Sequence, residues 1–216
     1  REHPGTIVSC PRPARPAVAD PTAITIPADL LPADGRFGCG PSKVRPEALD
    51  ALAATGRDLL GTSHRKARVK DQVARLRTGI ADLFGLPEGY EVVLAPGGAT
   101  AFWEMATFGL VERRARHYVF GEFSSKFAAA TAAAPFLDDP DVVDAPVGSR
   151  PVPSPAGDVD VQALTHNETS TGVMMDVLRP GDDALVLVDA TSGAGGLPVD
   201  PTQFDAYYFS LQKGFA

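Results

Sequence analysis

The sequence predicts an α/β domain built on a mostly parallel sheet flanked by helices. Short apolar runs alternate with segments whose apolar residues recur at helical spacing, which is typical of parallel strands joined by helical crossovers. Each run leads into glycine or polar residues, so we expect the functional side chains at the carboxyl ends of the strands, where such sheets bind ligands. The predicted strands are residues 90–95, 117–120, 161–164, 184–188 and 206–210.

Helical patterns fill most of the segments between these runs. Pro46 stands near the start of the first amphipathic helix, which Gly61 can end, and Gly85 can end the second. The other predicted elements are helices at 101–108 and 126–134 and, within a proline-rich surface loop at 138–157, one weak strand at 142–143.

Composition and charge narrow the class of protein. Hydrophobic residues make up 44% and charged residues 22% of the 216, as in soluble globular domains. The net charge of −7 disfavours nucleic acid and membrane partners, because both select basic patches. Residues 1–33 are interrupted by prolines and are predicted to be disordered, whereas residues 34–216 are predicted to form part of a larger folded domain.

The two cysteines indicate a reducing compartment. Cys10 and Cys39 lie far apart and lack the spacing of metal ligands, so free thiols are the expected state. The first residues contain no apolar segment typical of a secretory signal. We therefore predict a cytoplasmic protein that binds no metal.

Asp189 and Lys213 carry the most direct sign of chemistry. Asp189 follows the apolar run 184–188, so its carboxylate should be partly buried and in need of a partner. Lys213 follows the run 206–210, and apolar surroundings favour the uncharged amine of a nucleophile. A reactive lysine and a carboxylate that pairs with a ring nitrogen are what pyridoxal phosphate (PLP) requires. A metal ligand and a helix N-cap are the alternatives for Asp189.

Three further strand ends offer contacts to such a cofactor. Residues 97–100 lead into a helix, whose free N–H groups and dipole favour a phosphate, and Thr100 adds a hydroxyl. Phe123 can stack on a planar ring, and Thr169 can bond a phenolic oxygen. Ordinary alternatives are a chain reversal, a core aromatic residue and a turn.

His64 and Arg65 lie between the first two predicted helices. An arginine fork suits a carboxylate or phosphate of a substrate. Basic residues that cap the preceding helix are an equally good explanation.

In combination and in this order, the motifs resemble those of the phosphoserine aminotransferase family in its actinobacterial form. The resemblance runs from about Asp34 to Ala216. It implies the large PLP-binding domain of fold-type I aminotransferases. The motifs are Phe-Gly-x-Gly-Pro, Thr-Ser-His-Arg, Gly-Gly-Ala-Thr, Gly-Glu-Phe-Ser, His-Asn-Glu-Thr-Ser-Thr-Gly, Val-Asp-Ala-Thr-Ser-Gly and Gln-Lys.

The resemblance also implies a role for each matching residue. Lys213 would bind PLP covalently, Asp189 would pair with the pyridinium nitrogen, and Phe123 would stack on the ring. His64 and Arg65 would meet the substrate. The remaining implied contacts are Thr169 to the phenolic oxygen and, to the cofactor phosphate, Ala99, Thr100 and Gln212.

The implied reaction is amino transfer between L-glutamate and 3-phosphohydroxypyruvate in serine biosynthesis, with a second substrate pair in pyridoxine biosynthesis. Family members form homodimers and continue well beyond the lysine, so this chain is expected to be a fragment or a truncated product with little turnover alone. The alternatives are another class V enzyme, such as a serine–pyruvate or alanine–glyoxylate aminotransferase, or an inactive fragment that exposes apolar surface. A cysteine desulfurase is disfavoured, because nothing in the sequence would activate Cys39.

Overall fold

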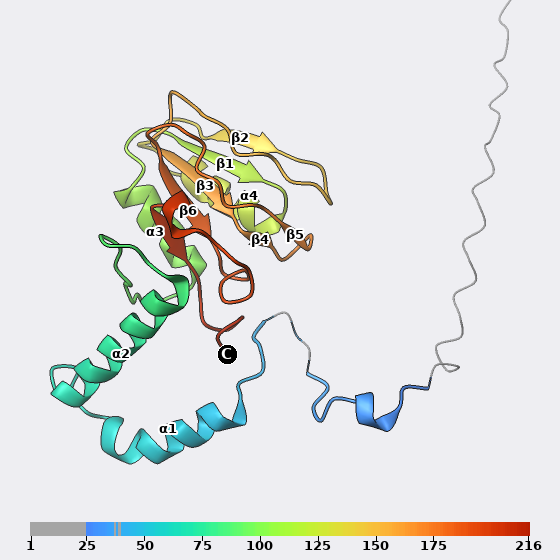
Figure 1. The fold of residues 1–216 in the computed structure, drawn as a ribbon. Helices are drawn as coiled ribbons and strands as arrows, with labels where there is room; N and C mark the ends of the chain where they lie inside the picture. The colour runs from blue at the N-terminus through green and yellow to red at the C-terminus, as the bar shows by residue number, and fades with distance from the viewer. Residues whose placement is uncertain (1–24, 37, 39) are drawn as a thin grey trace, which may run out of the picture. The chain divides into compact units, whose positions relative to one another are not determined.

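The computed structural model describes residues 25–36, 38 and 40–216, and it confirms an α/β fold with a parallel central sheet (Figure 1). Every strand and α-helix of the described residues lies in the folded unit Phe37–Ala216. Most of the segment 1–33 lies outside the described residues. Its described part, residues 25–33, contains the short 3-10 helix η2 (Ala28–Leu30).

Five parallel strands form the main sheet in the order β2–β1–β3–β6–β7. β1 (Ala115–Val119) lies between β2 (Asp141–Asp144) and β3 (Val161–Thr165), and β6 (Leu185–Asp189) lies between β3 and β7 (Ala206–Tyr208). The chain runs outward from β1 to β2 and then returns to β3 on the other side of β1. The strand order therefore reverses between β1 and β3, which is where open α/β sheets bind ligands.

One face of the sheet packs against two helices, α3 (Ala99–Gly109) and α4 (Glu122–Ala132). Trp103 of α3 and Phe127 of α4 join Ala163 and Leu187 of the sheet in one buried cluster. Ala163 and Leu187 point to this face, and the residues next to them in their strands point to the other face, because successive side chains of a strand point to opposite faces.

The opposite face of the sheet is covered by extended segments. Leu164 and Val186 project to this face and pack with Met175, Val177 and Phe204, which lie outside the regular strands. The 3-10 helix η3 (Pro201–Gln203) immediately precedes Phe204. The core is thus complete on both faces of the three central strands, with Val161 and Val186 fully buried.

The first two helices begin and end as the sequence predicts. Pro46 is the first residue of α1 (Pro46–Leu59), where a missing N–H breaks no helical bond. Gly85 ends α2 (Ala67–Phe84) with a φ of 58°, a left-handed conformation that favours glycine. Neither helix buries a residue, although both expose large apolar side chains, including Leu49, Leu52, Leu76 and Leu83.

The predicted strand at 90–95 is wrong. These residues form no regular element and pair with no strand of the described chain, and Val93 and Leu94 are 78% and 49% exposed. Residues with a high strand propensity form a strand only where a neighbouring strand accepts their backbone hydrogen bonds. Tyr90 does reach the domain, since its hydroxyl donates to the carbonyl oxygens of Pro201 and Phe204.

The other differences are in element boundaries and one small hairpin. α4 begins four residues earlier than the predicted 126, because the turn at Gly121 and Ser124 already starts the helix. β7 ends at Tyr208, two residues before the predicted 210. The weak strand predicted at 142–143 forms as β2. The sequence did not indicate the hairpin of β4 (Asn167–Glu168) and β5 (Val173–Met174).

Candidate active site

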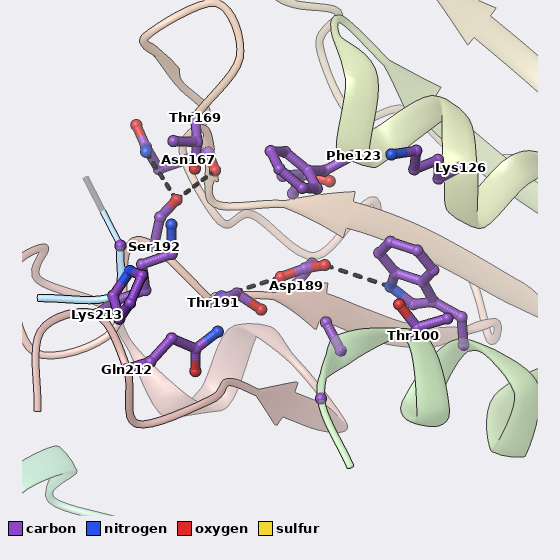
Figure 2. Close-up of a pocket in the computed structure, with 16 residues that line it drawn as sticks. Thr100, Phe123, Lys126, Asn167, Thr169, Asp189, Thr191, Ser192, Gln212 and Lys213 are labelled. Carbon is purple, nitrogen blue, oxygen red and sulfur yellow. Dashed lines mark hydrogen bonds between the residues drawn. The ribbon is translucent and has the colours of Figure 1, made fainter. Parts of the chain in front are cut away.

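A cavity of about 370 Å³ lies at the carboxyl ends of the strands (Figure 2). Its walls come from the N-terminal ends of α3 and α4, from the ends of β3 and β6 and the segments that follow β3, β6 and β7, and from Gly40 and Pro41 before α1. It is a size typical of sites for small molecules. All of the predicted cofactor contacts line this one cavity: Ala99, Thr100, Phe123, Thr169, Asp189, Gln212 and Lys213.

Asp189 ends β6 and is 5% exposed. Its Oδ1 accepts the backbone N–H of Thr191 at 2.9 Å, and its Oδ2 accepts the indole N–H of Trp103 at 3.3 Å. Burial raises the pKa of Asp189, and the hydrogen bonds from Thr191 and Trp103 oppose that rise. A cation placed in the cavity would therefore find a carboxylate that gains from being paired.

Trp103 is a cavity residue that the sequence analysis missed. Its indole Nε1–H also donates to the hydroxyl of Tyr208, at 2.9 Å, so one donor joins α3 to β6 and β7. Burial raises the pKa of Tyr208 well above its usual value, with the charge of Asp189 adding to the shift. An indole in a helical run looks like an ordinary core residue, and no local pattern showed that it would face Asp189.

The N-terminus of α3 is open to the cavity. Gly98, its N-cap residue, provides no side-chain hydrogen bond, and the first turn contains no acidic residue. The first backbone N–H groups of a helix lack intrahelical partners and carry its positive dipole end. Gly97 has a φ of 93°, so the turn into this helix needs glycine. Ala99 and Thr100 therefore offer donors for an anion.

Lys213 lies in the turn that follows β7. A Cβ atom on Gly40 would lie 2.5 Å from the Cε and Nζ atoms of Lys213. The backbone at Gly40 therefore packs directly against the lysine side chain. A Cβ atom on Gly214 would lie 2.6 Å from the carbonyl oxygen of Ala194. Without a side chain, Gly40 can lie against Lys213, and Gly214 can lie against the segment that follows Asp189.

Two polar residues tie the segments after β3 and β6 together. The Asn167 side chain donates to Ser192 Oγ at 2.9 Å, and the Ser192 hydroxyl donates to the Asn167 carbonyl oxygen at the same distance. Both residues line the cavity beside Thr169. They belong to polar runs that the sequence analysis singled out, but their pairing depends on β3 and β6 being neighbours.

Phe123 and Lys126 reach the cavity from the first turns of α4. Phe123 is 39% exposed, and the Lys126 ammonium lies 5.7 Å from the centre of its ring. Lys126 also forms an ion pair with Glu122 at 2.9 Å. Glu168, which the sequence analysis missed, is fully buried against the start of the same helix.

Comparison with known proteins places this chain in a family. The family model "Aminotransferase class-V" matches residues 156–216, which include Asp189 and Lys213. The phosphoserine aminotransferase of a Nocardioides species is 62% identical over 198 residues, covering 90% of this chain and 53% of that protein. The chain belongs to the class V aminotransferase family.

Solved structures of class V aminotransferases have the same fold. The phosphoserine aminotransferase of Cytophaga hutchinsonii superposes with a TM-score of 0.74 and 31% identity over 81% of this chain and 50% of that one. The alanine–glyoxylate aminotransferase of a Nostoc species, at 21% identity and a TM-score of 0.68, shares the fold. The chain spans about half the length of the curated relatives it matches.

The cavity of this class V chain fits a flat, anionic, aromatic cofactor. An aromatic ring, a buried carboxylate, a primary amine and an open helix N-terminus face the same space. The Thr191 hydroxyl is buried with no hydrogen-bond partner, the only such side-chain atom in the described part of the chain. An unpaired buried hydroxyl in a cavity wall is expected where a polar ligand binds.

His64 and Arg65 do not reach this cavity. They lie between α1 and α2, are exposed, and are absent from the cavity wall. Their substrate-binding role in this class V chain stays a prediction. Cys10 and Cys39, which underlie the predictions on thiol state, lie outside the described residues.

No metal site or membrane span appears in the described ranges 25–36, 38 and 40–216. No three or more His, Cys, Asp or Glu side chains gather there as metal ligands would. No helix in these ranges has the length and apolar character needed to cross a bilayer.

Proposed function

We propose that the complete protein is a PLP-dependent phosphoserine aminotransferase. It would transfer the amino group of L-glutamate to 3-phosphohydroxypyruvate, giving O-phospho-L-serine and 2-oxoglutarate for serine biosynthesis, with a related role in pyridoxine biosynthesis. The supporting observation is that the Asp189 carboxylate, the Lys213 amine and the open N-terminus of α3 face one cavity. The 62% identity to a phosphoserine aminotransferase over 90% of the chain supports the substrate choice.

The chain's residues would hold PLP at both of its ends. The amides of Ala99 and Thr100, with the Gln212 side chain, would bind the phosphate, because a helix N-terminus favours an anion. Asp189 would hold the proton on the ring nitrogen, and Phe123 would cover one face of the ring. Thr169 would orient the phenolic oxygen. When bound, PLP supplies an electron-withdrawing ring that stabilises negative charge on the α-carbon of an attached amino acid.

Lys213 would anchor the cofactor and then move a proton. Its Nζ atom would hold PLP covalently before the substrate arrives. Once free, the same amine would take the proton from the substrate's α-carbon. It would give this proton back at a later step of the amino transfer. His64 and Arg65 are proposed to bind the charged ends of the substrate, supported by the match of an arginine fork to carboxylate and phosphate.

We also propose that the protein is a cytoplasmic homodimer. The exposed apolar side chains on α1 and α2 support a further interface, since large apolar patches on a protein surface commonly mark association sites. The pair of widely spaced cysteines supports a reducing compartment.

A substrate comparison tests the proposed function. The complete gene product would be purified with PLP, and 2-oxoglutarate release from L-glutamate would be measured with 3-phosphohydroxypyruvate, hydroxypyruvate and glyoxylate as acceptors. We expect the phosphorylated acceptor to give the highest kcat/KM. A higher value for glyoxylate, with L-alanine as donor, would instead assign the enzyme to the alanine–glyoxylate class.

Replacement of Lys213 tests the role of this residue in the same protein. Lys213→Ala should abolish the visible absorbance of covalently held PLP and lower turnover by about 10³-fold or more, because no other amine replaces the nucleophile. Lys70→Ala, on the exposed surface of α2, is the matched control and should leave both unchanged. Retention of the absorbance in Lys213→Ala would show that another residue holds the cofactor.

A further inference from the structure

We propose that Glu168 is a positioning residue of this site: its carboxylate holds the first turn of α4 and thereby fixes the ring of Phe123 against bound PLP. The inference rests on the proposed function, since it assigns a new residue to the cofactor site. Glu168 does not line the cavity and was not singled out by the sequence analysis.

The contacts of Glu168 are concentrated at the start of α4. Its Oε2 atom accepts the backbone N–H of Ser124 at 2.9 Å, the backbone N–H of Phe123 at 3.1 Å and the hydroxyl of Ser124 at 2.9 Å. The N–H groups of a first helical turn have no intrahelical partners, and a negative charge there interacts favourably with the helix dipole. One carboxylate therefore serves as the cap that Gly121, the N-cap residue, has no side chain to provide.

Ser170 completes this arrangement. Its hydroxyl donates to Glu168 Oε1 at 2.8 Å, and the backbone N–H of Glu122 donates to Ser170 Oγ at 2.9 Å. The backbone N–H groups of residues 122, 123 and 124 are thus all held by the segment 168–170. Phe123 is the middle residue of the three.

Gly121 is required by the close approach of Glu168. A Cβ atom on Gly121 would lie 2.6 Å from Glu168 Cδ and 2.5 Å from Ser170 Oγ. Any larger residue at this position would displace the carboxylate from the helix. Because Gly121 has extended backbone angles, space alone sets this requirement.

The link to the cofactor follows from the exposure of Phe123. The residue is 39% exposed, so packing from one side only would leave its ring room to move. Glu168 lies between Asn167 and Thr169, which line the cavity, and Figure 2 shows Thr169 and Phe123 reaching that cavity from the two segments. The buried carboxylate therefore joins two walls of the cofactor site and sets the backbone from which the ring projects.

The charge state of Glu168 agrees with this role. Burial raises the pKa of Glu168, but the hydrogen bonds from Ser124, Ser170 and Phe123 outweigh burial, so the pKa lies below its ordinary value. The carboxylate is thus ionised at neutral pH, as a helix-capping anion needs to be.

A double-mutant cycle in the complete gene product tests whether Glu168 acts through Phe123. Glu168→Gln keeps the size of the side chain but removes its charge and turns an amide N–H toward other donors. We expect it to raise the Kd for PLP by about tenfold in the native background. In a Phe123→Leu background the same change should raise Kd by no more than about twofold. An equal effect in both backgrounds would overturn the proposal, because it would show that Glu168 acts independently of the ring.

Three further variants separate positioning from general stability. Glu122→Gln removes a neighbouring exposed charge from the same turn and should leave the PLP Kd within about twofold. Gly121→Ala should reproduce the Glu168→Gln effect. If Glu168→Gln fails to fold, Ser170→Ala should still weaken PLP binding by about two- to threefold, since it removes one bond to the carboxylate. No change in Ser170→Ala would then contradict the proposal.

The visible circular dichroism of bound PLP provides the second readout. At saturating PLP, a misplaced ring in Glu168→Gln should change this signal, whereas a loss of stability alone would leave it unchanged. If the native protein binds no PLP, the proposed function fails. If the native protein binds PLP but the cycle is additive and the dichroism is unaltered, only the role of Glu168 fails.

Discussion

At the scale of single residues, Asp189 depends on neighbours from two different elements. The backbone N–H of Thr191 is supplied by the same loop, but the indole N–H of Trp103 comes from α3. Burial raises the pKa of Asp189, and these two donors oppose that rise, so they favour the charged carboxylate that pairs with a cation. The tryptophan therefore supports the proposed role of Asp189 as the partner of a protonated ring nitrogen.

Trp103→Phe tests this dependence in the complete gene product. The change keeps an aromatic ring in the core but removes the N–H donor to Asp189 Oδ2. We expect kcat to fall by about tenfold while KM changes by less than about twofold, because the lost bond acts on the reacting ring rather than on substrate binding. Steady-state kinetics measures both values. A higher KM with an unchanged kcat would show that Trp103 shapes the substrate pocket instead.

His117 makes stability depend on pH. The side chain is 1% exposed, its Nε2 lies 2.9 Å from Thr131 Oγ1, and burial lowers its pKa to about 4. The unfolded chain, with a histidine pKa near 6.5, therefore binds a proton between pH 6.5 and 4 that the folded chain excludes. Stability should fall as the pH drops through this window, by about 3 kcal/mol in total.

Thermal unfolding between pH 7 and pH 4.5 measures this effect. The decline should be smaller in His117→Gln, which cannot take up the proton, even though this variant is less stable at pH 7. An equal decline in both proteins would show that other groups control the acid sensitivity.

At the scale of elements, strand propensity succeeded only where a neighbour was available. β1, β3, β6 and β7 form at the predicted runs because each has a parallel partner. The run 90–95 has equally suitable residues but no partner strand among the described residues, and it forms no regular element. The hairpin β4–β5 pairs the polar residues Asn167 and Glu168 with Met174 and Val173. The hydrogen bonds from the start of α4 to Glu168 help to hold it in place.

Two glycines, one within α2 and one at its end, should respond in opposite ways to replacement by alanine. Gly79 lies within the helix with open space around it, so Gly79→Ala should stabilise the protein by about 0.5–1 kcal/mol. Gly85 caps the helix with a φ of 58°, so Gly85→Ala should destabilise it by about 1 kcal/mol. Urea unfolding of both variants tests the sign of each effect. Equal signs would contradict the assigned backbone conformations.

At the scale of the whole molecule, the three central strands are buried on both faces, but α1 and α2 leave most of their apolar side chains exposed. Phe84 at the end of α2 does contact Tyr207 and Phe215. Both helices have an apolar face, yet neither buries a residue. Amphipathic helices gain most of their stability from tertiary packing, so these two require a further surface. The substrate residues proposed between them, His64 and Arg65, would gain fixed positions only when that surface is present.

The polypeptide of residues 1–216, expressed alone, should therefore be a poor enzyme. We expect it to self-associate through the exposed apolar faces and to turn over substrate at least about 10²-fold more slowly than the complete gene product, because its substrate contacts are not held in place. Analytical ultracentrifugation and the glutamate assay measure the two properties. Turnover equal to that of the complete gene product would show that residues 1–216 contain every group that the reaction needs.

The sequence by itself determined the fold class, most of the strands and part of the cavity wall, including Asp189, Phe123 and Lys213. Asp189 and Lys213 were identifiable because an apolar run followed by a polar residue has a local cause, the burial of a strand and the exposure of its end. The tertiary structure alone decided which donors reach Asp189, that Glu168 caps α4, and that the run 90–95 stays unpaired. These features depend on contacts between residues far apart in the chain, such as Trp103 with Asp189 and Phe123 with Glu168, and no local pattern encodes them.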